Sequence, residues 1–222
     1  MTLELYAHPF SSYCQKVLIA LYENATPFEF RMLGFGPDAD ERITGEFARL
    51  WPLQRMPLLV DAGRPVMEAT IIIEHLDVFH RGRVRFLPDD ARAALDVRTM
   101  DRFFDNYVMT PMQRIVFDAI RKPDQRDPHG VADARALLDT AYRWLDGALA
   151  GREWAAGSAF SLADCAAAPA LLYADWAHPI PREHSRVRDY RQRLLARPSY
   201  ARAVDEARPY RANFPLGDPG RD

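Results

Sequence analysis

Two adjacent serines stand where a predicted strand meets a predicted helix. Ser11 and Ser12 follow an extended segment that ends near His8, and an apolar stripe of helical period comes directly after them. The N-terminus of a helix has unpaired N–H groups and a partial positive charge, which favour a bound anion. No histidine or acid is spaced so as to activate a serine nucleophile. We therefore expect a hydroxyl that stabilises the anion of a bound molecule, with plain helix capping as the alternative.

Two further turns carry groups that suit an amino-acid-like or tripeptide ligand. Arg55-Met56-Pro57 opens a predicted strand. A proline at such a bend, above all after a cis bond, leaves the preceding peptide free to pair with an extended ligand, although it can also simply begin the strand. Glu68-Ala69 ends the next strand and opens a helix, which places a carboxylate beside unpaired N–H groups. Taken alone, Glu68 would be a capping or solvated acid.

Three side chains outside these turns have two interpretations each. Cys14 follows Ser11 by three residues, and its spacing to Val17 points it inward, which favours a buried small side chain over an exposed thiol. Phe104 and Tyr107 lie in an aromatic-rich helical segment. Helical spacing of this kind is more often core, with the wall of an apolar pocket as the alternative.

The predicted secondary structure changes near residues 81–90, from alternating strands and helices to helices alone. Before that point, period-2 and period-3.6 patterns alternate in the order β-α-β-α-β-β-α. The hairpin in this series turns at Asp61–Arg64, where Gly63 suits the tight turn. The sequence therefore predicts a small α/β domain over residues 1–82.

Only helical patterns follow, over residues 83–222. Asp90 is a good helix cap, and a long helix after it should bend at Pro111. Ser161–Asp164 resembles a capping box at the start of an alanine-rich helix, which gives Asp164 a structural role. Two more helices are expected on either side of Pro198. The second domain is therefore predicted to be all-α.

Composition excludes several classes of protein. The 222 residues include 29 basic and 31 acidic side chains, a balance that argues against a nucleic-acid binder. No apolar run is long enough for a membrane span, and the first residues do not resemble a secretory signal. The 2 cysteines allow no disulfide framework, which indicates a cytoplasmic protein. Zinc-type and nucleotide-binding spacings are absent, so no metal is expected.

Four segments, in this order and spacing, are similar to those of the soluble, cytosolic-type glutathione transferases. They are Ser11–Leu21, Met56–Asp61, Glu68–Leu76 and Phe160–Asp164. The resemblance covers nearly the whole chain and indicates a serine-type member without indicating a subclass. It implies a thioredoxin-like, glutathione-binding domain followed by a helical domain that forms the hydrophobic-substrate side.

The resemblance also implies roles for individual residues. Ser11 would hold the glutathione thiolate, with Ser12 as the second candidate donor. Met56 would pair its backbone with the cysteinyl unit, beside Pro57 as the cis proline of the family. Arg55 would suit the glycine carboxylate.

The acidic turn completes the implied glutathione site and departs from the family pattern. Glu68 would face the γ-glutamyl amine, and the backbone N–H of Ala69 would meet the γ-glutamyl carboxylate. Relatives usually carry serine at the position of Ala69, so a hydroxyl contact is lost unless Thr70 replaces it. Gln54 stands where relatives often have glycine, which narrows the conformations of that loop.

The function implied is that of an enzyme with glutathione as its co-substrate and no metal. It would activate the thiolate for attack on a small hydrophobic electrophile, in a detoxification role, with Phe104 and Tyr107 as pocket residues and a homodimer as the assembly. Three alternatives remain open: glutathione-dependent isomerisation or dehalogenation, thiol reduction through Cys14, and a non-catalytic binding module. The electrophile depends on pocket shape and is not readable from the sequence.

Overall fold

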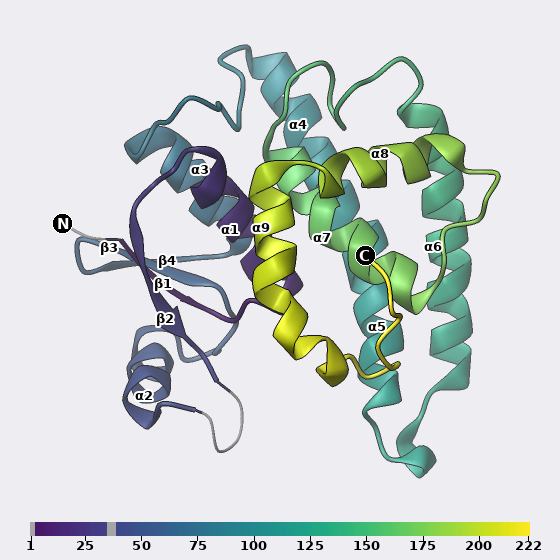
Figure 1. The fold of residues 1–222 in the computed structure, drawn as a ribbon, viewed down its shortest axis with the longest axis horizontal. Coiled ribbons are helices and arrows are strands. Elements are labelled where there is room, and N and C mark those ends of the chain that lie inside the picture. The colour runs from purple at the N-terminus through teal and green to yellow at the C-terminus, as the bar shows by residue number, and fades with distance from the viewer. Residues whose placement is uncertain (1–2, 35–38) are drawn as a thin grey trace.

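The computed structural model describes residues 3–34 and 39–222. Figure 1 shows a four-stranded sheet with helices on both faces, beside a group of helices formed by the rest of the chain. The first part consists of β1 (Leu3–Ala7), α1 (Ser12–Glu23), β2 (Phe28–Met32), α2 (Glu41–Leu50), β3 (Leu58–Asp61), β4 (Arg64–Met67) and α3 (Ala69–Phe79). This is the predicted order β-α-β-α-β-β-α, so the thioredoxin-like fold class is confirmed.

The sheet has the strand order β2-β1-β3-β4. Strand β1 runs parallel to β2 and antiparallel to β3, with Leu5 opposite both Phe30 and Leu59. Alternate residues of a strand point to opposite faces. Leu5 therefore packs in the core with α1 and α3, whereas Tyr6 packs with Phe47 of α2 on the other face.

The hairpin between β3 and β4 turns through two residues with positive φ. Ala62 has φ 52° and Gly63 has φ 79°. Positive φ at both central residues is what a two-residue hairpin of the right-handed sheet requires, and glycine adopts it without strain. This turn fixes the end of β3 at Asp61 opposite Arg64.

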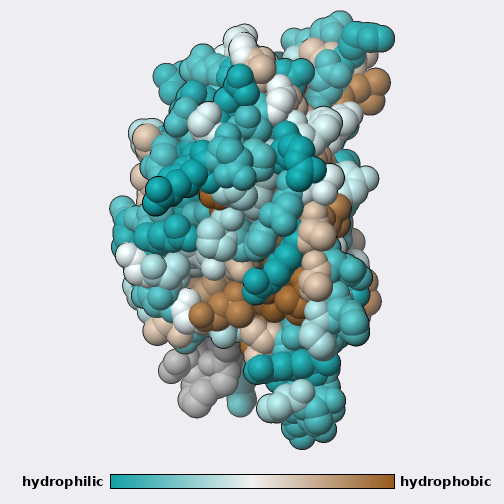
Figure 2. Space-filling view, turned by 90° about the vertical axis from the view of Figure 1, so that its right-hand side faces the viewer, coloured by the Kyte–Doolittle hydropathy of each residue, from teal (hydrophilic) through white to brown (hydrophobic). Residues whose placement is uncertain are grey.

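The remaining residues form helices, which confirms the all-α second part. They are α4 (Ala91–Phe103), α5 (Thr110–Ala119), α6 (Pro128–Ala148), α7 (Leu162–Ala177), α8 (Ser185–Leu195) and α9 (Pro198–Ala207). Short 3-10 turns occupy Pro123–Gln125 and Arg208–Asn213. None of the helices within the described residues is both long and apolar enough to cross a membrane. Figure 2 views the helical side of the molecule, where a hydrophobic band interrupts a mostly hydrophilic surface.

The long helix expected to bend at Pro111 is instead interrupted just before it. Residues Phe104–Met109 form a π-helical segment between α4 and α5. Proline has no N–H to donate and its ring crowds the carbonyl four residues earlier, so the helix cannot continue regularly there. Pro111 itself lies in the first turn of α5, where the missing N–H costs nothing.

Helix α1 packs against both parts of the molecule. It contacts α3 within the first part and α7 and α9 in the second, and all of these share one cluster of buried hydrophobic residues. Polar contacts flank that cluster, because Arg197 and Ser199 both bind the Glu23 carboxylate and the Tyr22 hydroxyl donates to Glu206. The helix that begins at the two serines is thus held on two sides.

Candidate functional site

Three turns lie together at one end of the sheet, where its strands begin or finish. Because β3 is antiparallel to both its neighbours, the end of β1, the start of β3 and the end of β4 meet, with Tyr6, Leu58 and Met67 in one row. The turn before α1, the peptide before β3 and the turn before α3 all adjoin this row. The structure therefore brings together the three segments that the sequence singled out.

Ser11 occupies the position immediately before α1 and does not cap it. Its backbone is extended, with φ −81° and ψ 124°, and its side chain makes no capping hydrogen bond. Its carbonyl accepts from the Gln15 N–H at 2.9 Å, as the first bond of the helix requires. The Ser11 side chain is partly exposed, whereas Ser12 is buried in the first turn. Of the two serines, Ser11 is the better placed to donate to an external anion.

The peptide bond between Met56 and Pro57 is cis. Met56 is half-buried and Pro57 is buried at the entry to β3, while Arg55 is exposed and forms no ion pair within residues 3–34 and 39–222. Gln54 has φ 50°, in the left-handed region that glycine adopts without cost. The loop thus keeps a conformation suited to glycine although a longer side chain stands there.

Glu68 carries the least usual backbone of the site. Its φ is 68° and its ψ is 119°, and its side chain is exposed and does not cap α3. A non-glycine residue in such a region is strained, and strain of this kind concentrates at ligand-binding and catalytic positions. The next residue, Ala69, begins α3 with a backbone N–H that no earlier helical carbonyl can satisfy.

A buried ionic network behind these turns was missed by sequence reasoning. Lys16 is 1% exposed, and its Nζ lies 2.6 Å from Asp101 Oδ1 and 2.9 Å from Asp105 Oδ2. The same Nζ donates to Thr70 Oγ1 at 2.9 Å. Arg102 closes the network from the surface by contacts to both aspartates and to Thr70. A lysine inside an apolar helical stripe was the one available signal.

The network ties the start of α3 to α4 and to the π-helical segment. Thr70 also donates to Asp101 Oδ2 at 3.0 Å, so the residue after Ala69 is held from the helical part. Burial raises the pKa of Asp105, and the neighbouring Lys16 charge opposes that shift. The pKa of Tyr13 is raised chiefly by burial and further by the charges of Asp105 and Glu68. Tyr13 therefore lies within reach of the charges of both the network and the acidic turn.

Both cysteines are fully buried. Burial raises the pKa of the Cys14 thiol to about 11, although the Ser11 hydroxyl and the His8 backbone oppose the shift. Burial also raises the pKa of Cys165 well above its ordinary value. Because the thiolate is the reactive form, neither side chain is suited to thiol exchange at neutral pH.

We expect neither cysteine to react with iodoacetamide in the folded protein at pH 7.5. Both thiols are buried, and burial raises the pKa of each, so the reactive thiolate is scarce at that pH. Intact-mass spectrometry should show the unmodified chain when folded and 2 added groups in denaturant, where the chain's 2 cysteines are exposed. Rapid modification of Cys14 in the folded protein would contradict this and restore the thiol-reductase alternative.

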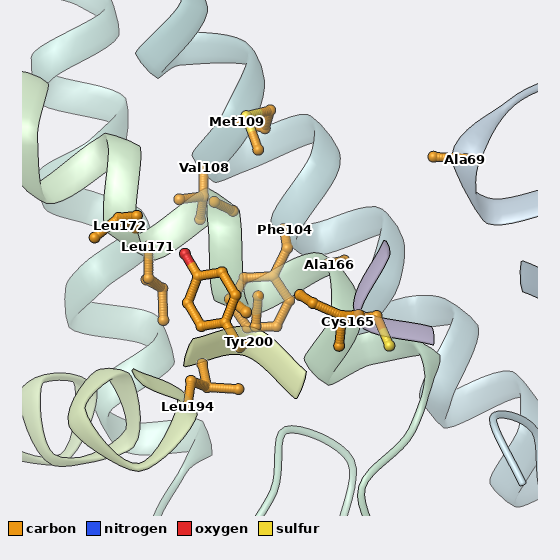
Figure 3. Packing of buried hydrophobic residues seen from close by; sticks show 14 of the residues in the cluster. Ala69, Phe104, Val108, Met109, Cys165, Ala166, Leu171, Leu172, Leu194 and Tyr200 are labelled. Carbon is orange, nitrogen blue, oxygen red and sulfur yellow. The ribbon is translucent and has the colours of Figure 1, made fainter. Parts of the chain in front are cut away.

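The two candidate pocket residues lie in different surroundings. Phe104 is fully buried in the main hydrophobic cluster, and Figure 3 shows it inside that packing. Tyr107 is 51% exposed, with its ring centroid 5.9 Å from that of Phe103. Phe103 in turn packs on Trp144 of α6 at 4.5 Å. Phe104 is thus a core residue in this structure, and Tyr107 alone of the two is accessible to a substrate.

Comparison with known proteins assigns the fold to a family. Residues 5–83 match the glutathione S-transferase N-terminal domain, and residues 127–193 match the glutathione S-transferase C-terminal domain. Together the two matches cover more than half of the chain. The chain belongs to the glutathione S-transferase family.

Relatives and solved structures of this family align along most of the chain. Glutathione S-transferase theta-1 of Mus musculus is 25% identical over 202 residues, which cover 88% of this chain and 83% of that relative. A probable maleylacetoacetate isomerase of Vibrio cholerae is 25% identical over 219 residues, and this alignment covers 94% of this chain and 98% of that relative. These relatives leave the transferase subclass unassigned.

Two of the similar solved structures hold a ligand. A glutathione S-transferase of Methylobacillus flagellatus KT with glutathione bound has a TM-score of 0.81 at 21% identity, over 91% of this chain and 98% of its own. A glutathione S-transferase of Methylobacterium radiotolerans in complex with glutathione sulfonate has a TM-score of 0.78 at 27% identity, over 92% and 95%. Both share the two-part architecture of this transferase.

Proposed function

We propose that this transferase binds glutathione at the edge where the three turns meet and activates its thiolate for attack on a small hydrophobic electrophile. The observation that carries the proposal is the Ser11 hydroxyl, which stands at the N-terminus of α1 and is not used to cap it. A thiolate there would meet a hydroxyl donor and the positive end of the helix dipole. Ser12 is the second candidate donor, disfavoured by its burial.

The other two turns would hold the rest of the tripeptide. Met56, next to Pro57, would pair its backbone with the cysteinyl unit in the manner of an added strand. Arg55, exposed and without an ion pair in the described part of the chain, would take the glycine carboxylate. The Glu68 carboxylate would bind the γ-glutamyl amine, and the Ala69 N–H would bind the γ-glutamyl carboxylate.

The energetics of thiol activation are within reach of these groups. Lowering a thiol pKa by about two units requires roughly 3 kcal/mol of preferential thiolate stabilisation. One charge-assisted hydrogen bond contributes about 1.5–3 kcal/mol, and a helix N-terminus adds about 0.3–1 kcal/mol. Ser11 and the start of α1 together can therefore supply the shift, while the enzyme adds proximity between the two reactants.

We place the electrophile on the helical side, at Tyr107, because Phe104 is enclosed in the core. The proposal also includes a homodimer, a cytoplasmic location and a role in detoxification, which the family resemblance supports. The electrophile itself depends on the shape of a pocket lined by variable helices.

Titration with glutathione at neutral pH tests the proposal directly. Thiolates absorb ultraviolet light more strongly than thiols, so activation should appear as a difference absorbance that saturates with glutathione. Calorimetry on the same samples gives the binding affinity independently. Saturable binding together with the thiolate signal is the expected result. Binding without ionisation would overturn thiol activation and favour a binding module, and absence of binding would overturn glutathione as the ligand.

Glutathione-dependent isomerisation is the second candidate, since one relative is named a probable maleylacetoacetate isomerase and aligns over 98% of its length. The two functions share the thiolate and differ in what happens after attack. A transferase keeps the thioether product, whereas an isomerase releases glutathione unchanged. A panel of halonitrobenzenes and cis-dienones would distinguish them: mass spectrometry detects the thioether product, and chromatography separates the cis and trans isomers, which have equal mass.

A further inference from the structure

Two histidines and an aspartate meet at the end of the sheet away from the three turns. His75 lies near the end of α3, His80 directly follows that helix, and Asp61 ends β3. The His75 Nε2 is 2.9 Å from Asp61 Oδ2, and the His80 Nε2 is 2.7 Å from the same oxygen. One ligand atom from each side chain lies within 4.8 Å of the others.

The arrangement has the chemistry of a transition-metal site. Two imidazole nitrogens and one carboxylate oxygen are ligands that Zn²⁺, Co²⁺ and Ni²⁺ accept, and a fourth position would be left for water. In a tetrahedron with bonds of about 2.0–2.1 Å, ligand atoms are about 3.3 Å apart. The present Nε2–Oδ2 distances need to widen by only about half an ångström.

The three side chains are both held in place and accessible. His75 is 12% exposed, Asp61 20% and His80 29%, so an ion can enter while most of each side chain is packed. The two imidazole rings also hold the Asp61 carboxylate in position, because both Nε2 atoms lie within hydrogen-bond distance of its Oδ2. The hairpin turn fixes Asp61, and the His80 N–H bonds to the Leu76 carbonyl, so both backbones are constrained.

We infer that Asp61, His75 and His80 form a binding site for one divalent transition-metal ion, separate from the glutathione site. The ion would join the end of β3 to the end of α3. Pro57 and Ala69 lie at the opposite ends of these two elements, where glutathione is proposed to bind. The ion would therefore stabilise those elements from a distance of about 16 Å, which is the length of the 11-residue α3. Sequence spacing did not indicate this site because its aspartate comes from a different element.

The test uses the full-length protein without a polyhistidine tag, stripped with EDTA and desalted. Co²⁺ is titrated and its visible d–d absorption followed, and Zn²⁺ binding is measured by calorimetry. We expect one ion per chain with micromolar affinity and a tetrahedral Co²⁺ spectrum. A hundredfold excess of Zn²⁺ over its dissociation constant should raise the melting temperature by about 5 °C or more.

Single variants locate the ion. Asp61→Asn, His75→Gln and His80→Gln should each weaken Zn²⁺ binding by about tenfold or more, since loss of even an outer-shell partner costs that much. His129→Gln is the matched control, because His129 is exposed in α6 and outside the cluster. Circular dichroism of each metal-free variant checks folding, and His80→Gln, beyond the helix end, is the mildest change. Absence of binding to the unaltered protein overturns the inference, as does binding that persists in all three cluster variants.

Discussion

The Lys16→Met variant is expected to lose about 3–5 kcal/mol of folding free energy. The substitution keeps the apolar stem but removes the charge that faces Asp101 and Asp105. Asp101 is fully buried, and an uncompensated carboxylate in such a place is costly because the solvent cannot reach it. Because Thr70 also loses its lysine partner, the start of α3 loosens as well.

Thermal or urea unfolding measures this loss, with the melting temperature falling by about 10 °C. The matched control is Arg186→Met, which breaks the exposed pair with Asp146 and should cost about 1 kcal/mol or less. Adding Asp101→Asn and Asp105→Asn to Lys16→Met should restore most of the stability, since no buried charge then lacks its partner. A loss no larger than that of the control would show that the network contributes no net stability.

The Ser11→Ala variant is expected to lose about ten- to a hundredfold in kcat/KM for conjugation of a chlorodinitrobenzene. The loss corresponds to one charge-assisted hydrogen bond to the thiolate, about 1.5–3 kcal/mol. The pH profile should move to higher pH by about one to two units, because the bound thiol returns toward its ordinary pKa. Stability should hardly change, since the Ser11 side chain does not cap the helix.

Ser12→Ala is the paired control, since Ser12 is adjacent and carries the same hydroxyl. Steady-state rates, the pH profile and the thiolate absorbance of both variants are compared with those of the unaltered protein. If Ser12→Ala shows the loss instead, the donor is Ser12. If neither variant loses activity, a serine hydroxyl does not activate the thiol in this transferase.

The local elements were predictable because their signals lie close together in the sequence. The turn at Gly63, the helix start at Asp90 and the box at Ser161–Asp164 each depend on a few neighbouring residues. In the structure Asp90 caps α4 through the Ala93 N–H, and Asp164 accepts from the Ser161 N–H. Hydrogen bonds of this kind join residues only three positions apart, so the sequence alone is enough to predict them.

Features made by distant segments were not predictable. The Lys16 network joins α1, α3, α4 and the π-helical segment, and the cluster at Asp61 joins a strand end to a helix end. The burial of Phe104 was not predictable either, because apolar residues at helical spacing look the same in the sequence whether they face the core or a substrate pocket. The π-helical segment was not predictable for a similar reason. Pro111 predicts an irregularity in the helix, but it does not predict which backbone conformation the preceding turn takes.

Helix α1 packs against α3 in the first part and against α7 and α9 in the second, and this packing limits how the sequence can change in evolution. Consider a hybrid protein that joins residues 1–82 of this chain to the helical part of another family member. The buried face of α1 would then have to pack against an α7 and an α9 of different sequence. Glu23 and Lys16 would also need new partners for their charges. Under the proposed function, new substrate preferences are more readily acquired by point changes near Tyr107 than by such an exchange, because these changes leave the packing of α1 intact. The helix that begins at Ser12 thus limits which halves can be inherited together.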